Sequence, residues 1–168
     1  MPYPEENYMQ KSEKRPALLI DRDGTINRDC PYCHDPKDLH IYKKAVELIK
    51  YYSKKGYLVI VVTNQSGINR GYFSEREVEV FNAELKKRVE AMGGKIDDFF
   101  FCPHRPDENC VCRKPRTGML KKIISKYDID LTRSIVVGDR DDIDGEFARN
   151  AGLSFKIIFN KDDEGSNH

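Results

Sequence analysis

Asp21 and Asp23 follow a short apolar run and stand two positions apart in the chain. Because residues i and i+2 of an extended chain point to the same side, the two carboxylates should lie close together. Close carboxylates repel each other unless a cation lies between them. Asp139, which follows another apolar run, could be a third ligand. An oxygen-only site with few protein ligands fits Mg²⁺, which completes its shell with water and substrate phosphate.

This set of acids predicts chemistry at phosphorus. One aspartate could attack phosphorus and form an acyl phosphate, while the other served as acid and base. A single aspartate at a strand end is more often a helix cap or a turn residue. Three acids on the same edge of the predicted structure are harder to explain by structure alone, so the pattern favours function.

Possible phosphate-binding groups lie in two other segments. Lys114 could hold phosphate oxygens as a point charge, although a lone lysine is more often simply solvated. A polar turn after the apolar run Leu58 to Val62 offers a hydroxyl and backbone N–H groups, which bind phosphate well. Taken alone, this turn could be an ordinary loop. Its residues are Thr63, Asn64, Gln65, Ser66 and Gly67.

Three cysteines and a histidine occur within eleven residues, at Cys102, His104, Cys110 and Cys112. Cys₃His is a common ligand set of structural zinc sites. A closed four-ligand site is expected to order a loop rather than to perform catalysis. The alternative is a group of unpaired, reduced thiols.

A second cysteine pair lies in the segment Cys30-Pro-Tyr-Cys33-His34. The spacing matches the C-x-x-C-H of c-type haem attachment, but that chemistry needs export and no signal for export is evident. The pair could also be redox-active or act as a reversible clip. We favour incidental thiols in a loop that faces the substrate.

Short apolar runs alternate with longer segments of helical periodicity. The runs are apolar on both faces, as expected for a parallel sheet covered by helices on each side. This order predicts an α/β fold with a doubly wound, mostly parallel sheet, whose ligands lie beyond the carboxyl ends of the strands. The predicted strands are Ala17 to Ile20, Leu58 to Val62, Phe99 to Phe101, Ile135 to Val137 and Phe155 to Phe159. The predicted helices are Lys43 to Lys55, a segment from the capping box at Ser74 to Gly93, Met119 to Tyr127, and Asp144 to Asn150.

Composition excludes some classes of protein. The 168 residues carry 29 Lys and Arg against 28 Asp and Glu, a net charge of +1, so a general polyanion binder is disfavoured. No apolar run is long enough to span a bilayer. The polar N-terminal segment lacks the apolar region of a secretory signal, which favours a cytoplasmic protein.

The length suits one domain. We expect flexible tails at 1–15 and 161–168 and a single domain at 16–160, with a zinc loop at 102–112 and no room for a separate cap domain. The site should then be open, and partly walled by the zinc loop and by the loop from Asn27 to Asp38. The expected partner is a small phosphate ester, with no nucleic acid and no membrane, and we expect a monomer.

The motifs together resemble those of the haloacid-dehalogenase superfamily of phosphatases. Asp21-Arg-Asp-Gly-Thr25, Thr63-Asn64, Lys114 and Gly138-Asp139 are similar to its first to fourth motifs. The resemblance covers about Ala17 to Phe159. The segments Thr-Asn-Gln-Ser-Gly-Ile68, Cys-Pro-His104 and Cys112-Arg-Lys-Pro115 are similar to the zinc-containing branch, which includes heptose-bisphosphate and histidinol-phosphate phosphatases.

The resemblance implies a Mg²⁺-dependent phosphomonoesterase with an aspartyl-phosphate intermediate. Asp21 would be the nucleophile and Asp23 the general acid and base. Mg²⁺ would bind the Asp21 side chain, the Asp23 backbone and Asp139. Thr63 and Lys114 would stabilise the phosphoryl group. The residues implied near the substrate are Arg113, Arg140 and the segment from Asp29 to Tyr32, and those implied at zinc are Cys102, His104, Cys110 and Cys112.

Several alternatives stay open. The five residues between His104 and Cys110 resemble the histidinol-phosphate branch, whereas Ser66 to Gly71 resembles the heptose branch, which we favour. A nucleic-acid 3′-phosphatase shares the Thr-Asn-Gln-x-Gly-Ile pattern, and a non-enzymatic phospho-acceptor domain shares the strand-end acid. The second acid of the fourth motif could be Asp142 or Asp144.

Overall fold

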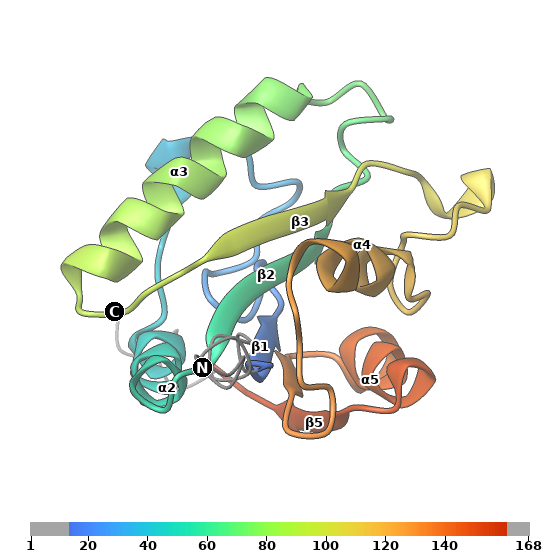
Figure 1. Ribbon diagram of the computed structural model, residues 1–168. Coiled ribbons are helices and arrows are strands. Elements are labelled where there is room, and N and C mark those ends of the chain that lie inside the picture. Colours follow the sequence, from blue (N-terminus) through green and yellow to red (C-terminus); the bar gives the residue numbers. More distant parts are fainter. Residues whose placement is uncertain (1–13, 161–168) are drawn as a thin grey trace, which may run out of the picture.

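The computed structural model describes residues 14–160, and these form one five-stranded parallel sheet in the order β3-β2-β1-β4-β5 (Figure 1). The expected flexible tails at 1–15 and 161–168 fall almost wholly outside the described residues. The strands are β1 (Ala17–Ile20), β2 (Leu58–Asn64), β3 (Asp98–Cys102), β4 (Ile135–Gly138) and β5 (Ser154–Ile157). The α-helices are α2 (Lys43–Lys54), α3 (Glu75–Ala91), α4 (Gly118–Lys126) and α5 (Glu146–Ala151). Single turns of helix lie at η1 (Pro36–Asp38), η2 (Pro106–Glu108) and η3 (Asp141–Gly145).

Helices cover both faces of the sheet, which confirms the predicted doubly wound architecture. On one face, Val46 and Ile49 of α2 and Phe81 of α3 pack against β-strand side chains such as Leu18 and Val59. On the other face, the helices α4 and α5 pack against the alternate side chains of the same strands (Figure 1). Because both faces are covered, β1 and most of β2 are buried and their apolar runs do not alternate with polar residues.

Strand β1 lies between β2 and β4, so the sheet's central strand carries the first motif. Ile20 pairs with Val61 of β2 and with Val137 of β4, and the three strands therefore end at nearly the same level. Asp21, Asn64 and Asp139, far apart in sequence, consequently reach the same edge of the sheet. This edge is where ligands bind in open α/β sheets.

The segment before α3 contains the predicted capping box. The Ser74 hydroxyl accepts a hydrogen bond from the Glu77 N–H at 3.1 Å, and the Glu77 carboxylate accepts one from the Ser74 N–H at 3.1 Å. These bonds satisfy N–H groups that the first turn of a helix leaves without partners. They fix where α3 starts, and thereby the end of the loop that leads from β2.

The last predicted helix differs in its start. Instead of one helix from Asp144, the chain forms the wide π-helical turn η3, and α5 begins at Glu146. Within this turn the N–H groups of Asp144 and Gly145 both donate to the carbonyl of Arg140, at 2.8 and 3.3 Å. The wide turn directs Asp144 inward, where its side chain is buried.

No helix among residues 14–160 combines the length and the apolar character that crossing a membrane requires.

Candidate active site

A pocket of about 530 Å³ lies at the carboxyl edge of the sheet. It contains every residue that the sequence assigned to catalysis, Mg²⁺ or substrate. These are Asp21, Asp23, Asp29, Tyr32, Thr63, Asn64, Gln65, Ser66, Arg113, Lys114, Asp139 and Arg140. The structure therefore brings together side chains from the ends of β1, β2 and β4 and from two loops.

Lys114 lies at the centre of the pocket floor. Its ammonium group contacts a carboxylate oxygen of Asp21 at 2.9 Å and one of Asp144 at 2.8 Å. The lysine side chain is only 3% exposed. Of the two acids left open for the fourth motif, Asp144 is thus the one in the site, while Asp142 is exposed and pairs with Arg140.

The carboxylates of the floor are not fully compensated by this lysine. Burial raises the pKa of Asp21 well above its usual range, and the neighbouring charges of Asp144 and Asp139 add to this, against the opposing effect of Lys114. Burial and Asp144 likewise raise the pKa of Asp139. The charges of Asp21 and Asp144 raise the pKa of Lys114, against the effect of burial, and keep it protonated.

Two glycines allow these acids to approach one another. Gly24 has a φ of +87°, and a Cβ atom at this position would overlap the Asp139 carboxylate. A Cβ atom on Gly138 would overlap the side chain of Asp144. Thr25 fixes the same group, because its hydroxyl lies 3.2 Å from Asp139 and 3.4 Å from Asp21. Close packing against the Asp139 and Asp144 side chains thus explains why the first and fourth motifs contain glycine.

Asp21, Asp139 and Asp144 offer one ligand atom each, and these atoms lie within 4.8 Å of one another. One buried ammonium group faces three carboxylates, so charge balance favours an additional cation. A set of carboxylate oxygens beside an open pocket suits Mg²⁺, which keeps water or phosphate among its ligands. The residues present therefore fit this ion.

Asp23 is held apart from that cluster by a separate set of donors. Its carboxylate accepts hydrogen bonds from the Asn27 amide at 3.1 Å and from the Gln65 amide at 3.0 Å. Arg22 donates to both of its oxygens, at 3.0 and 3.1 Å. The side chains at 21 and 23 face the same pocket, as their spacing predicted, but they have different partners.

The second and third motifs are bonded directly to each other. The Asn64 amide donates to the backbone carbonyl of Lys114 at 3.1 Å and accepts from the Lys114 N–H at 2.9 Å. Gln65 donates to the Thr63 hydroxyl at 2.9 Å. These bonds align the Thr63 hydroxyl and the Lys114 ammonium group on the same floor.

The walls of the pocket are more exposed and mixed in charge. Arg113 and Arg140 supply positive charge to the lining, and Asp29 supplies negative charge. Burial, together with the charges of Asp23 and Asp139, raises the pKa of Asp29. Tyr32, which has a φ of +54°, packs edge-on against Tyr72 with 4.7 Å between ring centroids.

Beside the pocket, the predicted zinc ligands form a second cluster, which begins at Cys102, the last residue of β3. Their ligand atoms lie within 4.8 Å of one another. The Sγ atom of Cys102 lies 3.3 Å from Nδ1 of His104, 3.6 Å from Sγ of Cys110 and 2.7 Å from Sγ of Cys112. Burial, with the neighbouring thiols, raises the pKa of Cys102, so a bound metal would have to displace thiol protons. Three thiols and an imidazole converging in this way fit zinc.

The zinc loop lines the pocket less than expected. None of its four candidate ligands is a lining residue, and Arg113, which directly follows Cys112, is the nearest part of that segment in the wall. The loop instead supports the polar turn after β2. The Gln65 N–H donates to the carbonyl of Cys102 at 2.7 Å, and the Asn69 N–H donates to that of Pro103 at 3.3 Å.

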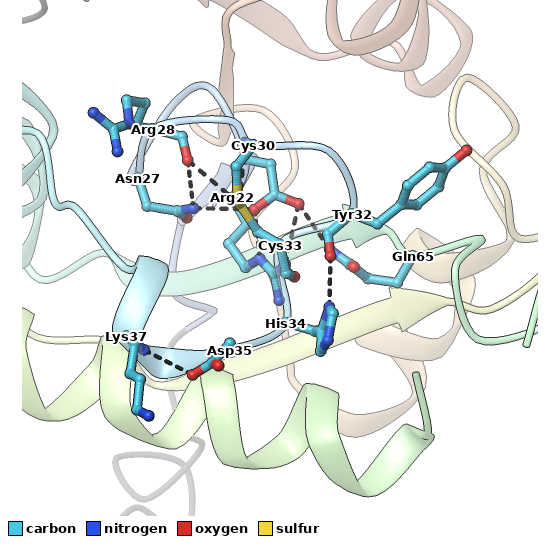
Figure 2. The surroundings of a disulfide bond; sticks show 11 residues. Arg22, Asn27, Arg28, Cys30, Tyr32, Cys33, His34, Asp35, Lys37 and Gln65 are labelled. Carbon is cyan, nitrogen blue, oxygen red and sulfur yellow. Dashed lines mark hydrogen bonds and ion pairs between the residues drawn. A yellow bond between two sulfur atoms is a disulfide. The ribbon is translucent and has the colours of Figure 1, made fainter. Parts of the chain in front are cut away.

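The interpretation of Cys30 and Cys33 as incidental thiols is wrong in this structure, where a disulfide joins them (Figure 2). Their backbones are close, with 5.2 Å between Cα atoms, and the left-handed Tyr32 between them turns the chain back. The Cys30 N–H also points at Sγ of Cys33. The two-residue spacing allowed this pairing, but the surrounding turn was not visible in the sequence.

Sequence reasoning missed Arg22 and left Asp144 undecided. Arg22 stands between the two motif aspartates and is fully buried. Its motif neighbours Asp21 and Asp23 are charged, so nothing in the sequence signalled burial, and an isolated arginine usually lies at the surface. Asp144 could not be chosen because the wide turn η3 shifts the register that a regular helix would give.

Comparison with known proteins agrees with this geometry. The profile of the family described as "Polynucleotide kinase 3 phosphatase" matches residues 19–158. A Thermoplasma acidophilum protein named "Probable D-glycero-D-manno-heptose-1,7-bisphosphate 7-phosphatase" is 50% identical over 151 residues, which are 90% of this chain and 94% of that protein. A Helicobacter pylori protein named "D-glycero-beta-D-manno-heptose-1,7-bisphosphate 7-phosphatase" is 38% identical and covers 84% of this chain and 79% of its own length.

Two solved structures are similar in fold and sequence. A structure described as "D,D-heptose 1.7-bisphosphate phosphatase from B. bronchiseptica complexed with magnesium and phosphate" has a TM-score of 0.78 and 30% identity, and covers 91% of this chain and 87% of that one. A Mesorhizobium loti structure described as a "putative had-like phosphatase" has a TM-score of 0.78 and 35% identity, with 83% and 70% covered. The chain therefore belongs to the polynucleotide kinase 3 phosphatase family, a group of haloacid-dehalogenase-type phosphatases, as its strand-end motifs predicted.

Proposed function

We propose that this phosphatase removes one phosphate from a heptose 1,7-bisphosphate, with D-glycero-D-manno-heptose 1,7-bisphosphate 7-phosphatase activity. The chemistry is supported by one observation above others, the convergence of Asp21, Asp139, Asp144 and Lys114 on the pocket floor. The choice of substrate is supported by relatives of that name, which are up to 50% identical over nearly their whole length.

In the first step Asp21 is the nucleophile. One of its carboxylate oxygens attacks phosphorus, the bond from phosphorus to the sugar oxygen breaks, and the sugar oxygen takes a proton from Asp23. Lys114 and the Thr63 hydroxyl hold the phosphoryl oxygens, because charge must be stabilised where it develops on those oxygens. Lys114 also keeps the Asp21 side chain aimed into the pocket.

In the second step a water molecule attacks the aspartyl phosphate. Asp23, which lost its proton in the first step, accepts a proton from this water. The bond from phosphorus to Asp21 breaks, and inorganic phosphate and the free carboxylate result. Asp23 thus serves both steps, first as acid and then as base.

Both metal ions belong to this proposal. Mg²⁺ would be held by Asp21, Asp139 and the Asp23 backbone, with Asp144 beside it, and would neutralise phosphate charge. Zinc would be held by Cys102, His104, Cys110 and Cys112, and would order the loop that supports the polar turn after β2. The zinc site is then structural.

The walls suit a small, polar phosphate ester. The pocket volume of about 530 Å³ lies within the range of small-molecule sites. Arg113 and Arg140 offer positive charge beyond the floor, and Asp29, Tyr32 and Ser66 offer hydrogen-bonding groups. A sugar that carries a second phosphate could use both kinds of group.

A phosphate-release panel tests this proposal. We expect rapid release from D-glycero-D-manno-heptose 1,7-bisphosphate, little from histidinol phosphate, and loss of release when Mg²⁺ is withheld. The α and β anomers should be supplied separately, since curated relatives of both kinds exist. Equal or faster release from histidinol phosphate would contradict the proposed substrate. Release that does not depend on Mg²⁺ would contradict the proposed role of the metal.

The family match makes a 3′-phosphorylated oligonucleotide the necessary second substrate class. A net charge of +1 gives no strong attraction to polyanions. We therefore expect little phosphate release from oligonucleotides. Preference for the oligonucleotide over the heptose bisphosphate would replace the proposed substrate but keep the chemistry.

A further inference from the structure

We propose that Arg22 is the positioning residue for Asp23, and that it holds the acid and base of the reaction at the orientation both proton transfers need. This inference rests on the proposed function, since it concerns how Asp23 is aimed. Arg22 itself does not line the pocket, so it would act only through its neighbour.

The guanidinium group of Arg22 binds the Asp23 carboxylate with two parallel hydrogen bonds. Nε donates to Oδ1 at 3.0 Å and Nη2 donates to Oδ2 at 3.1 Å. A planar fork that meets a carboxylate in this way fixes its plane as well as its distance. A single point charge could fix only the distance.

The guanidinium group is itself immobilised on three sides. Nη1 donates to the side-chain oxygen of Asn82 in α3 at 3.0 Å, and Nη2 donates to the backbone carbonyl of Cys33 at 3.0 Å. The group also lies over the Phe81 ring, 4.3 Å from its centroid. Figure 2 shows Arg22 beside the disulfide turn that supplies the Cys33 carbonyl. Arg22 therefore connects Asp23 to a helix and to a closed loop.

The burial of Arg22 makes its pairing with Asp23 necessary. The Arg22 side chain is 0% exposed, and its charge cannot be removed by deprotonation. A buried charge must be paired and hydrogen-bonded to be tolerated, and Asp23 is the carboxylate that pairs with it. The Asn27 and Gln65 amides that also reach Asp23 are neutral. Asn27 lies in the same loop as Asp23, and Gln65 follows β2. They can support the carboxylate but cannot replace the fork.

Orientation of Asp23 matters at two moments of the reaction. In the first step one Asp23 oxygen must carry the proton for the leaving sugar oxygen, and in the second the same oxygen must accept a proton from water. Both oxygens accept bonds from Arg22 and from an amide, so the Asn27 or Gln65 bond must open at the reacting oxygen while the Arg22 fork holds the carboxylate plane. A displacement of about 1 Å can reduce such a step roughly 10²-fold. Loss of the fork should therefore slow chemistry without weakening substrate binding.

Arg22→Lys is the variant that separates positioning from folding. It keeps a buried positive charge but removes the fork. We expect kcat to fall roughly 10²-fold with KM changed less than about threefold, because the lost interaction matters in the transition state rather than in binding. Asn82→Ala is the matched control. It removes one anchor of the guanidinium group but leaves both bonds to Asp23, so we expect kcat within about threefold of the wild type.

p-Nitrophenyl phosphate supplies a readout that a purely structural role would not change. Its leaving group needs no proton, so the first step does not depend on Asp23 whereas the second does. We expect Arg22→Lys to release nearly one equivalent of nitrophenolate per protein in a burst, followed by slow turnover. With the sugar phosphate, both steps are slow and no burst of sugar should occur.

Four other outcomes decide whether Arg22 positions Asp23 or only serves packing. Equal loss of kcat in Arg22→Lys and Asn82→Ala, without a burst, would assign Arg22 to packing and overturn the inference. So would unchanged kcat in Arg22→Lys. If Arg22→Lys does not fold, Arg22→Ala is assayed with methylguanidinium added, and recovery of kcat would support the inference. Failure of both variants to fold would overturn it, since Arg22 would then serve the fold itself.

The wild-type protein distinguishes this failure from failure of the proposed function. If the wild type releases no phosphate from either ester with Mg²⁺ present, the proposed function is wrong. If the wild type is active and the variants behave as a packing defect, only the role of Arg22 is wrong.

Discussion

Asp142 and Asp144 stand two positions apart but have different environments. Asp144 is buried against Lys114, whereas Asp142 is exposed and bonded to Arg140. The sequence predicted Asp21 and Asp139 because they follow apolar strands, and Asp23 because it stands two positions from Asp21. It could not decide between these two later acids, since the choice depends on how widely the chain turns after β4.

The two acids form a matched pair of substitutions. We expect Asp144→Asn to weaken Mg²⁺ binding and activity about 10–100-fold, because it removes a carboxylate charge from the cluster and leaves Lys114 with one charged partner. Asp142→Asn should change either quantity less than about threefold, as for most exposed positions. Calorimetric Mg²⁺ titration and phosphate release measure the two effects. Equal effects in both variants would contradict the assignment of Asp144.

The role of Arg22 could not be predicted from the sequence either. Alternation in an extended chain places residue 22 on the opposite side from its two neighbours, away from the pocket. The structure shows that its long side chain bends back to Asp23, with Asn82, Cys33 and Phe81 around it. These partners come from distant segments, so only the folded chain brings them together.

At the scale of elements, strands were predicted more closely than turns. The run Ala17 to Ile20 matches β1, and β2 extends the predicted strand by its polar end. Apolar runs are reliable because burial on both faces demands them. The turn η3 and the disulfide turn at Cys30 and Cys33 were not predicted, because tertiary contacts rather than periodicity determine them.

The cysteine and histidine cluster after β3 allows a test of the zinc loop. We expect about one zinc per chain, and we expect Cys110→Ser to lower the free energy of unfolding by ~2 kcal/mol or more, a Tm decrease of roughly 4–8 °C at this size. Atomic absorption and thermal unfolding measure these quantities.

Val111→Ala is the control in the same loop, because Val111 is 76% exposed and contributes no ligand. Its zinc content and Tm should match the wild type. A wild-type protein that binds no zinc, or a Cys110→Ser variant that keeps full zinc and full stability, would contradict a structural zinc site.

Asp98 ties the start of β3 to the end of α4. Its carboxylate accepts hydrogen bonds from Lys126 at 2.8 Å and from Tyr127 at 2.7 Å. Burial would raise the pKa of Asp98, but these bonds and the Phe99 N–H outweigh it and lower the pKa. A lowered pKa in the folded state stabilises the protein above the unfolded-state pKa, and this contribution is lost as pH falls through the folded-state pKa.

We therefore expect Asp98→Asn to destabilise the protein by up to about 1 kcal/mol at pH 7, and the difference to shrink as pH falls below the unfolded-state pKa and through the folded-state pKa. Urea unfolding at several pH values measures this. In a Lys126→Met background the effect at pH 7 should shrink. A difference between the two proteins that stays constant from neutral to acid pH would show that the charge of Asp98 contributes nothing.

For the whole molecule, the strand order explains why distant segments make one site. Placing β1 between β2 and β4 brings the four motifs to one edge of the sheet, and helices on both faces bury the strands that carry them. Alternation of strands and helices sufficed to predict this architecture. A monomeric state, a single domain and a cytoplasmic location stay predictions from the sequence.

Asp21 becomes transiently bonded to phosphorus in the proposed reaction, and borohydride trapping tests this bond most directly. Protein in steady-state turnover with Mg²⁺ and heptose bisphosphate is treated with borohydride, which reduces an aspartyl phosphate to homoserine, and its peptides are sequenced by mass spectrometry. We predict homoserine at position 21 when substrate is present, none without substrate, and none in Asp21→Asn. Full turnover with an unmodified Asp21, or homoserine at another aspartate instead, would contradict the account.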